Sequence, residues 1–326
     1  MAEVKFGVFL PTGDFAEMKR SALRAEAEGF YSVSTNDHFF TPFGSPETPQ
    51  LECFTALTTI AALTSRIRLA PAVVNASFRT PPMLAKIAST LDHACNGRLT
   101  LGLGAGWKRD EYEAHNYRYP SNSERLDQLD ETVAVLKAMW TQRAPSFRGR
   151  HFAIDHAYNN PRPLQKPHPP IMLGGSGSKL LKIAAAHADV INLIPPIFNG
   201  KDFINDPPAA IKFDMAELKR RIDMLHGFAR AAGRDPRAIE VSGLSVGCLS
   251  RSANDPVLRA TAQQIGFGDV EAARRAPVFL MGTPEQVRRE IRTRLEQFGM
   301  TWHIIFFVND ESQRLFVKEV MPEFAR

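Results

Sequence analysis

The sequence predicts an α/β fold, a single (β/α)₈ TIM barrel with insertions, from two observations. Short runs rich in β-branched and aromatic residues alternate with amphipathic helical segments along the whole chain. Several of the strand segments are almost continuously apolar, as parallel strands buried on both faces are. A length of 326 residues suits one barrel. A doubly wound sheet is the main alternative, because it shares this alternation.

Each strand is placed where a β-prone run ends in a proline, a glycine or a polar residue. The expected strands occupy residues 5–10, 30–36, 66–74, 98–104, 170–175, 189–194, 239–247 and 301–308. Asp14 is the expected N-cap of the first helix, which Gly29 ends. Pro71 lies inside the third strand, and because proline cannot donate to a strand ladder we expect a bulge there.

The helices between these strands are placed by their apolar periodicity and their terminal residues. They are expected at residues 14–28, 51–64, 81–94, 122–142, 178–187, 214–232 and 284–298, with a last helix at about 311–321. Insertions are expected at 143–169, as an excursion or short hairpin, at 195–213, as a lid carrying Phe198 and Phe203, and at 248–277, as extra helical structure. No shift in composition divides the chain, so one domain over residues 1–326 is expected.

Composition and charge exclude several classes of protein. The net charge of +5 is mild, and no nucleic-acid-binding motif accompanies it. Cys53, Cys95 and Cys248 are far apart and form no CxxC pair, which favours a reducing, cytoplasmic setting. The chain carries no signal-peptide pattern and no apolar run long enough to span a bilayer. We therefore expect a cytoplasmic protein that binds a small molecule rather than nucleic acid or membrane.

In such a barrel the active site lies at the C-terminal ends of the strands. The residues that follow the strands are Pro11 and Thr12, Asn36 to His38, Asn75, then Gly104, Gly106 and Trp107, Gly174 to Gly177 and the loop after Ile194. In "LGGSGSKLL" a strand, four small residues and a helix follow one another. The unpaired N–H groups of such a helix N-terminus suit a phosphate, although a tight turn without ligand has the same pattern.

Two further motifs have more than one interpretation. "GLGAGW" has Trp107 where a dinucleotide-binding fingerprint needs its third glycine, so Gly104 and Gly106 are interpreted as bare backbone against a flat ring. Trp107 either lines that ring's pocket or caps the core. "NDHFF" offers a base, a metal ligand or a helix cap at Asp37 and His38, or a buried hydrogen-bonded pair. No second histidine is near, so no metal site is predicted, and no strand ends in the lysine of a Schiff-base enzyme.

Taken together, "FGVFLP", "NDHF", the segment 79–112, "PRPLQKPHPPIMLGGSG" and "FLMGTPEQVRREI" resemble the luciferase-like monooxygenase superfamily over nearly the whole chain. Within it the chain looks most like the oxidoreductases that depend on the deazaflavin coenzyme F420. The resemblance implies a flavin-type cofactor at the barrel mouth, backed by a non-proline cis peptide bond between Ala72 and Val73. It also implies that Asn75 reaches the cofactor, that Asp37 and His38 lie beside the ring and the substrate, and that a phosphate cradle is formed by Gly174, Gly175, Ser176 and Gly177.

One departure from the family pattern narrows the reaction. Sugar-phosphate dehydrogenases of this group have a glutamate at the end of the fourth strand, where this chain has Trp107. We therefore expect hydride transfer between deazaflavin C5 and a small, fairly apolar substrate, with His38 exchanging the proton and Asp37 orienting it. The alternatives are an FMN-dependent two-component monooxygenase, which needs a flavin reductase partner, and an inactive flavin-binding protein. The family resemblance also implies a homodimer.

Overall fold

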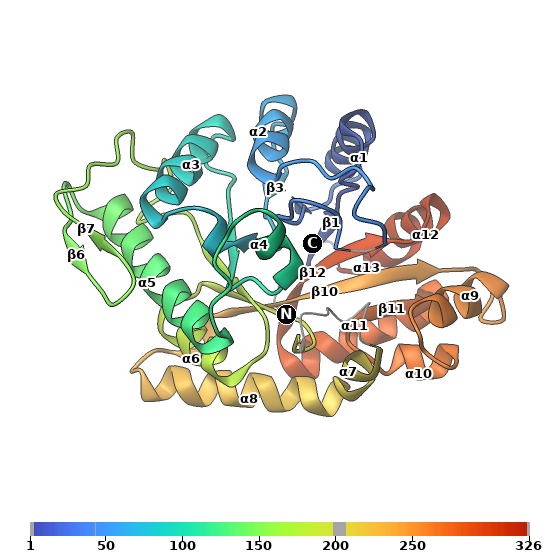
Figure 1. The fold of residues 1–326 in the computed structure, drawn as a ribbon. Helices are drawn as coiled ribbons and strands as arrows, with labels where there is room; N and C mark the ends of the chain where they lie inside the picture. Colours follow the sequence, from blue (N-terminus) through green and yellow to red (C-terminus); the bar gives the residue numbers. More distant parts are fainter. Residues whose placement is uncertain (1–2, 43, 198–206, 325–326) are drawn as a thin grey trace.

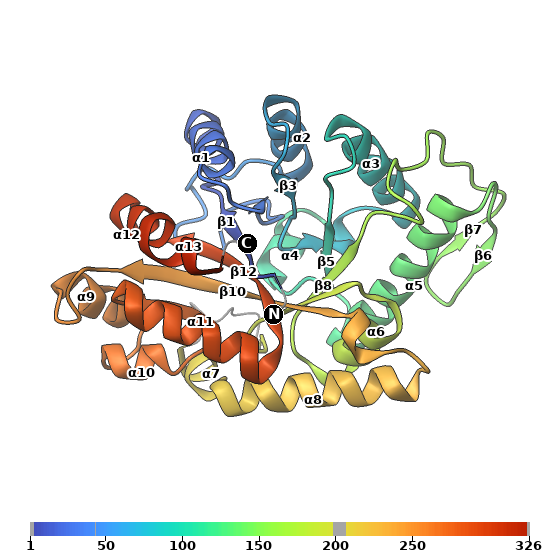
Figure 2. The same ribbon diagram turned by 180° about the vertical axis from the view of Figure 1, so that it is seen from behind.

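The computed structural model describes residues 3–42, 44–197 and 207–324. Parallel strands form a ring at the centre of the molecule, and helices surround it on the outside (Figure 1). The same arrangement is seen from behind in Figure 2. The expected α/β barrel is therefore confirmed, and with it the placement of the strand ends around one mouth.

Every expected strand position is occupied. The barrel strands are β1 (Lys5–Phe9), β2 (Ser32–Ser34), β3 (Arg68–Leu69), β4 (Val74–Asn75), β5 (Leu101–Gly104), β8 (Ile171–Gly174), β9 (Val190–Leu193), β10 (Glu240–Leu249) and β12 (Met300–Phe307). They pair in parallel in the order β3-β2-β1-β12-β10-β9-β8-β5-β4. β3 and β4 are the two parts of the third expected strand; β3 pairs with β2 and β4 pairs with β5, so this interrupted strand completes the ring.

The interruption lies where Pro71 predicted a bulge, and the peptide bond between Ala72 and Val73 is cis, as the resemblance predicted. Val73 occupies space that side chains on the neighbouring strands would need. A Cβ atom on Gly104 would lie 2.7 Å from Val73 Cγ2, and one on Gly174 would lie 2.8 Å from Val73 Cγ1. These glycines of β5 and β8 are therefore required by the bulge itself.

The expected helices are all present and cover the outer side of the strands. They are α1 (Phe15–Ala27), α2 (Cys53–Leu63), α3 (Pro81–Ala94), α5 (Asn122–Thr141), α6 (Ser178–His187), α8 (Met215–Ala231), α11 (Pro284–Phe298) and α12 (Asp310–Leu315), which continues through η3 (Phe316–Val320) into α13 (Met321–Phe324). Asp14 caps α1 by accepting a hydrogen bond from the Glu17 backbone N–H at 2.8 Å. Gly29 follows with a φ of 84°, which confirms both predicted ends of this helix.

The expected insertions contain short elements. β6 (Phe147–Arg148) and β7 (Ala153–Ile154) form an antiparallel hairpin, as predicted. α7 (Pro207–Lys212) belongs to the second insertion, in which Phe198 and Phe203 lie outside the described residues. The third insertion holds α9 (Pro256–Gln264) and α10 (Val270–Arg274). Outside these insertions, four of the described elements were not expected: β11 (Phe279–Gly282), which pairs with the end of β10, α4 (Arg109–Ala114), η1 (Ala76–Phe78) and η2 (Pro236–Ala238).

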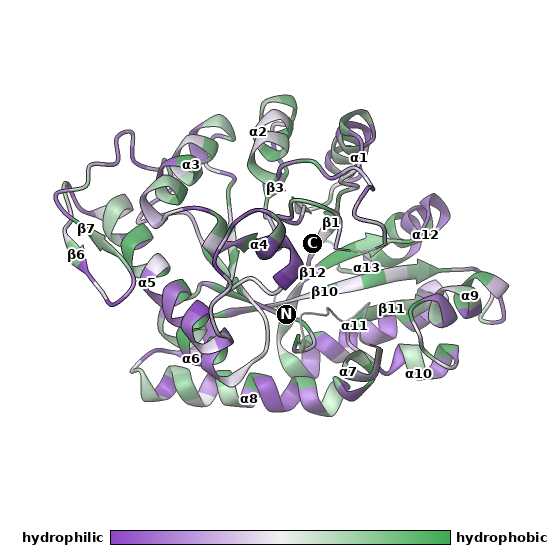
Figure 3. Ribbon diagram, viewed as in Figure 1, coloured by the Kyte–Doolittle hydropathy of each residue, from purple (hydrophilic) through white to green (hydrophobic). Residues whose placement is uncertain are grey.

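The main apolar core lies between the strands and the surrounding helices, and a smaller cluster inside the barrel includes Trp302 and Ile304 of β12. Hydrophobic and hydrophilic residues alternate along helices such as α8, as expected of helices with one buried face (Figure 3). None of the helices in the described ranges is both long enough and apolar enough to cross a bilayer.

One buried histidine stands out in the core. His303 of β12 is fully buried and stacks on Phe6, with 6.0 Å between the ring centroids. Neither ring nitrogen has a hydrogen-bond partner among the described residues. Burial, together with the positive charge of Arg294, lowers the pKa of His303 from 6.5 to about 3.

Candidate active site

A cavity of about 960 Å³ opens at the C-terminal ends of the strands, where barrel enzymes have their active sites. It is lined by every residue that the sequence predicted for the site. These are Asp37, His38, Ala72, Val73, Asn75, Gly104, Gly106, Trp107, Gly174, Gly175, Ser176 and Gly177. The structure thus brings together segments that are far apart in the chain, which the strand-end rule alone predicted.

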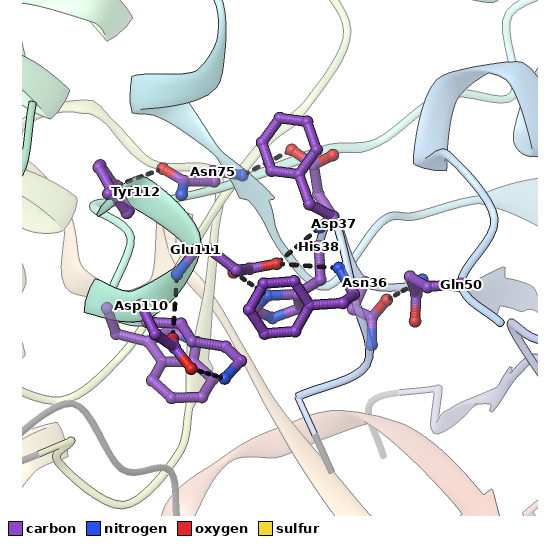
Figure 4. A network of polar contacts seen from close by, with 12 residues as sticks. Asn36, Asp37, His38, Gln50, Asn75, Asp110, Glu111 and Tyr112 are labelled. Atoms are coloured by element: carbon purple, nitrogen blue, oxygen red, sulfur yellow. Dashed lines mark hydrogen bonds and ion pairs between the residues drawn. The ribbon is translucent and has the colours of Figure 1, made fainter. Parts of the chain in front are cut away.

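His38 is held by a carboxylate that the sequence did not reveal. Its Nδ1 atom lies 2.7 Å from Oε2 of Glu111, on α4. The Glu111 side chain is 1% exposed, and its other oxygen accepts the Phe39 backbone N–H at 2.6 Å (Figure 4). Because an ionised carboxylate can only accept, it selects the tautomer with the proton on Nδ1. Nε2 of His38 is then the nitrogen that can exchange a proton with a ligand in the cavity.

Asp37 does not orient His38, and this part of the prediction is wrong. Its Oδ2 atom accepts hydrogen bonds from the Asn75 backbone N–H at 3.0 Å and from Arg79 Nη1 at 2.7 Å, and its Oδ1 atom accepts from Arg79 Nη2 at 3.0 Å. The two neighbouring side chains therefore have separate partners, Asn75 and Arg79 for Asp37 but Glu111 for His38. Burial lowers the pKa of Arg79, but its bonds to Asp37 and Glu52 outweigh this and raise it. Asp37 therefore anchors β4.

Asn75 presents one end of its amide to its neighbours. Its Oδ1 atom accepts from the Tyr112 hydroxyl and from the Ser77 backbone N–H, both at 3.0 Å. The amide NH₂ is therefore the group that is available to a ligand. Gly106 has a φ of 76°, and a Cβ atom there would lie 1.9 Å from the Tyr112 hydroxyl oxygen, so only glycine fits.

The turn between β8 and α6 has the features of an anion site. Gly177 is the N-cap of α6 and makes no side-chain cap, so the first N–H groups of the helix have no side-chain partner there. The Ser176 hydroxyl is buried without a hydrogen-bond partner among the described residues. A Cβ atom on Gly177 would meet nothing within 4 Å, whereas Gly175 is closed in by Leu180. This set of donors fits the phosphate of a flavin or deazaflavin.

Trp107 lies on the cavity wall rather than in the core. It is only partly buried, and its ring meets the His38 ring edge-on, with 5.5 Å between centroids. Apolar residues line another part of the cavity: Phe9, Leu244, Val246 and Phe306. Within the ranges that the structure describes, no three His, Cys, Asp or Glu side chains gather closely enough to hold a metal ion.

The model of the luciferase-like monooxygenase family matches residues 4–301. An uncharacterized protein of Mycobacterium tuberculosis is 32% identical over 201 residues, which are 56% of this chain and 70% of that protein. The FMNH₂-dependent dimethylsulfone monooxygenase of Pseudomonas putida is 28% identical over 254 residues, 78% of this chain and 63% of that enzyme.

The fold is similar to that of solved enzyme structures. An F420-dependent secondary alcohol dehydrogenase, solved with an F420–acetone adduct, superposes with a TM-score of 0.81. The two sequences are 18% identical, and the superposition covers 100% of both chains. At this identity the likeness concerns the fold. Proteins similar to this chain therefore include both F420-dependent and FMN-dependent enzymes.

Proposed function

The chain belongs to the luciferase-like monooxygenase family, and from this premise we propose that it is an F420-dependent oxidoreductase acting on a small organic substrate. The observation that carries the proposal is the His38–Glu111 pair on the wall of the cavity, 2.7 Å apart. Oxidation or reduction by hydride transfer needs a partner that takes up or gives a proton, and an imidazole does this near neutral pH. The deazaflavin, when bound, supplies or accepts the hydride.

The other residues of the site would hold and orient the cofactor. The bulge at Ala72 and Val73 would back the flat ring, and the Asn75 amide would reach its edge. Ser176 and the first N–H groups of α6 would bind the phosphate. Asp37 would keep β4 in place through its ion pair with Arg79, at 2.7 Å. Apolar residues such as Phe306 would favour a fairly apolar substrate.

A second candidate is an FMN-dependent monooxygenase. It is supported by the similarity to the FMNH₂-dependent dimethylsulfone monooxygenase and by the cradle, which suits the phosphate of FMN equally. A flavin reductase would then be a partner. An inactive flavin-binding protein would bind a cofactor without exchanging hydride. The homodimer and the cytoplasmic location stay predictions.

A competition experiment separates these functions. The absorbance spectrum of the protein after incubation with equal amounts of F420 and FMN reports which cofactor binds. We expect F420 to bind. Bound oxidised F420 is then expected to be reduced by small alcohols, and bound reduced F420 to be oxidised by small carbonyl compounds. Binding of FMN alone would contradict the proposal, and bound F420 without hydride exchange with any substrate would favour the inactive protein.

Replacement of His38 tests the proton-transfer role. His38→Ala is expected to keep cofactor binding and to lower kcat by about 100-fold or more. His156→Ala is the matched control, because His156 has a side chain that is 77% exposed and lies on the hairpin insertion. Unchanged turnover in His38→Ala would mean that another group exchanges the proton.

A further inference from the structure

We propose that Asn36 determines specificity by donating a hydrogen bond from its amide NH₂ to an oxygen acceptor of the substrate, and that Gln50 and Thr12 fix the direction of this donor. The inference rests on the proposed function for placing a substrate in this cavity. The role of Asn36 itself follows from the hydrogen bonds around it, whichever cofactor the protein binds.

Asn36 ends a chain of three polar side chains. Gln50 Nε2 donates to Asn36 Oδ1 at 2.9 Å (Figure 4). It also donates to the Leu51 backbone carbonyl at 3.2 Å. The Thr12 hydroxyl donates to Gln50 Oε1 at 3.0 Å. Every polar atom of the Gln50 side chain is therefore engaged, and the side chain is held at both ends of its amide.

The backbone carbonyl of Leu51 determines which side-chain atoms donate and which accept in this series of hydrogen bonds. A carbonyl oxygen can only accept, so the Gln50 atom beside it must be the NH₂ group. That same NH₂ group faces Asn36, which must then present its oxygen. The opposite orientation would bring two donors, or two acceptors, into contact. The Asn36 NH₂ group is thus forced to the side away from Gln50.

Asn36 lines the cavity, whereas Gln50 is not part of the cavity wall. The residue is 9% exposed, and no described residue accepts a hydrogen bond from its NH₂ group. Asn36 and His38 both line the cavity, whereas the Asp37 carboxylate between them is held by Asn75 and Arg79. A donor and a proton-exchanging nitrogen therefore share one wall, an arrangement that recognises an uncharged oxygen such as that of a carbonyl group.

The test compares two probes of equal shape, cyclohexanone and methylenecyclohexane, which differ only in C=O against C=CH₂. Their binding to the cofactor-loaded protein is measured by calorimetry. We expect the wild type to prefer the ketone by about tenfold or more, because the hydrocarbon leaves a buried donor unpaired. Asn36→Leu is expected to bring the two affinities within about threefold of each other.

Gln50→Glu tests the direction of the donor without altering Asn36. A carboxylate at position 50 can only accept, so the Asn36 amide turns, donates its NH₂ to position 50 and presents its oxygen to the cavity. The preference for the ketone is expected to disappear. Asn254→Leu, at an exposed position outside the site, is the control and keeps the preference. The ¹⁵N resonance of the Asn36 side chain in asparagine-labelled protein, expected to shift on addition of cyclohexanone, gives a readout independent of turnover.

The outcomes separate this inference from the proposed function. If F420 does not bind, the proposed function fails, and the same comparison is made on the FMN-loaded protein. If the wild type does not prefer the ketone, or if Gln50→Glu keeps the preference, the role of Asn36 is refuted even where F420 binds. A loss of cofactor affinity in Asn36→Leu with the ketone preference intact would also overturn it, by assigning the amide to the cofactor.

Discussion

His303→Leu is expected to make the protein more resistant to acid. The imidazole is fully buried between β12 and its covering helices, and neither nitrogen has a partner among the described residues. Leucine is similar in size and suits the apolar surroundings, so the substitution removes the ionisable group with little change of packing. It also removes two unpaired polar atoms, which favours the folded state at every pH.

The magnitude follows from the shifted pKa of His303, about 3 in the folded protein against 6.5 ordinarily. A folded state that binds the proton less tightly than the unfolded state loses stability as pH falls. The loss begins near the unfolded value and continues down to the folded value, at about 1.4 kcal/mol per pH unit. Integration from pH 7.5 to pH 5 gives a loss of about 2 kcal/mol in the wild type, which His303→Leu lacks.

Urea unfolding of both proteins at pH 7.5 and pH 5 measures this difference directly. Other groups titrate between pH 5 and pH 7.5, so the quantity compared is the difference in unfolding free energy between the two proteins at each pH. Ile305→Leu, on the same face of the same strand, is the control, because it alters packing and keeps the imidazole. If this difference between wild type and His303→Leu is not larger at pH 5 than at pH 7.5, the claim that His303 stays unprotonated in the folded protein is refuted.

Glu111→Gln is expected to lower kcat by about 100-fold with little effect on cofactor affinity, because the glutamine amide can donate to His38 Nδ1 and so place the imidazole proton on Nε2. Steady-state kinetics and a cofactor titration measure the two quantities, and an unchanged kcat would contradict this prediction. Gly177→Ala is expected to leave the melting temperature unchanged, since its Cβ site is open, and to weaken FMN or F420 binding about tenfold without weakening riboflavin binding. Equal losses for FMN and riboflavin would contradict the phosphate cradle. Gly102→Ala is expected to cost about 3 kcal/mol of unfolding free energy in urea, because its Cβ atom would lie 1.9 Å from the Pro71 carbonyl oxygen, and an unchanged midpoint would refute that clash.

The strands and helices of the barrel could be predicted because their signals are local. A β-prone run, a helix cap or a proline within a strand is visible in a few neighbouring residues, as the N-cap Asp14 and the bulge at Pro71 illustrate. β11 was missed because Phe279–Gly282 is short and follows an insertion that breaks the alternation. The strand-end rule was then sufficient to assemble the cavity wall.

The partners of the site residues could not be predicted in the same way. Glu111 lies 73 positions from His38 and on a short helix, within a charged run that resembles solvated surface. The mistaken role of Asp37 has the opposite cause. Adjacency in the sequence suggested a contact with His38, but the carboxylate is bonded to Asn75 and Arg79 instead. The partner of His38 and the partners of Asp37 both depend on which distant segments come into contact. The pattern of residues along a single chain does not specify those contacts.

The fit of Val73 against Gly104 and Gly174 has a consequence for redesign of the barrel mouth. Val73 fills the space that side chains at positions 104 and 174, on two neighbouring strands, would otherwise occupy. This part of the cavity, formed by Val73, Gly104 and Gly174, therefore cannot be changed one position at a time. A larger residue at either glycine requires a smaller residue at position 73, so the two substitutions have to be made together. The segment that carries Asn36 is tied to this part of the cavity by hydrogen bonds instead, from the Ala72 N–H to the Thr35 carbonyl and from the Asn75 N–H to Asp37, both at 3.0 Å. A substitution at Asn36 therefore needs no compensating change of side-chain volume at position 73.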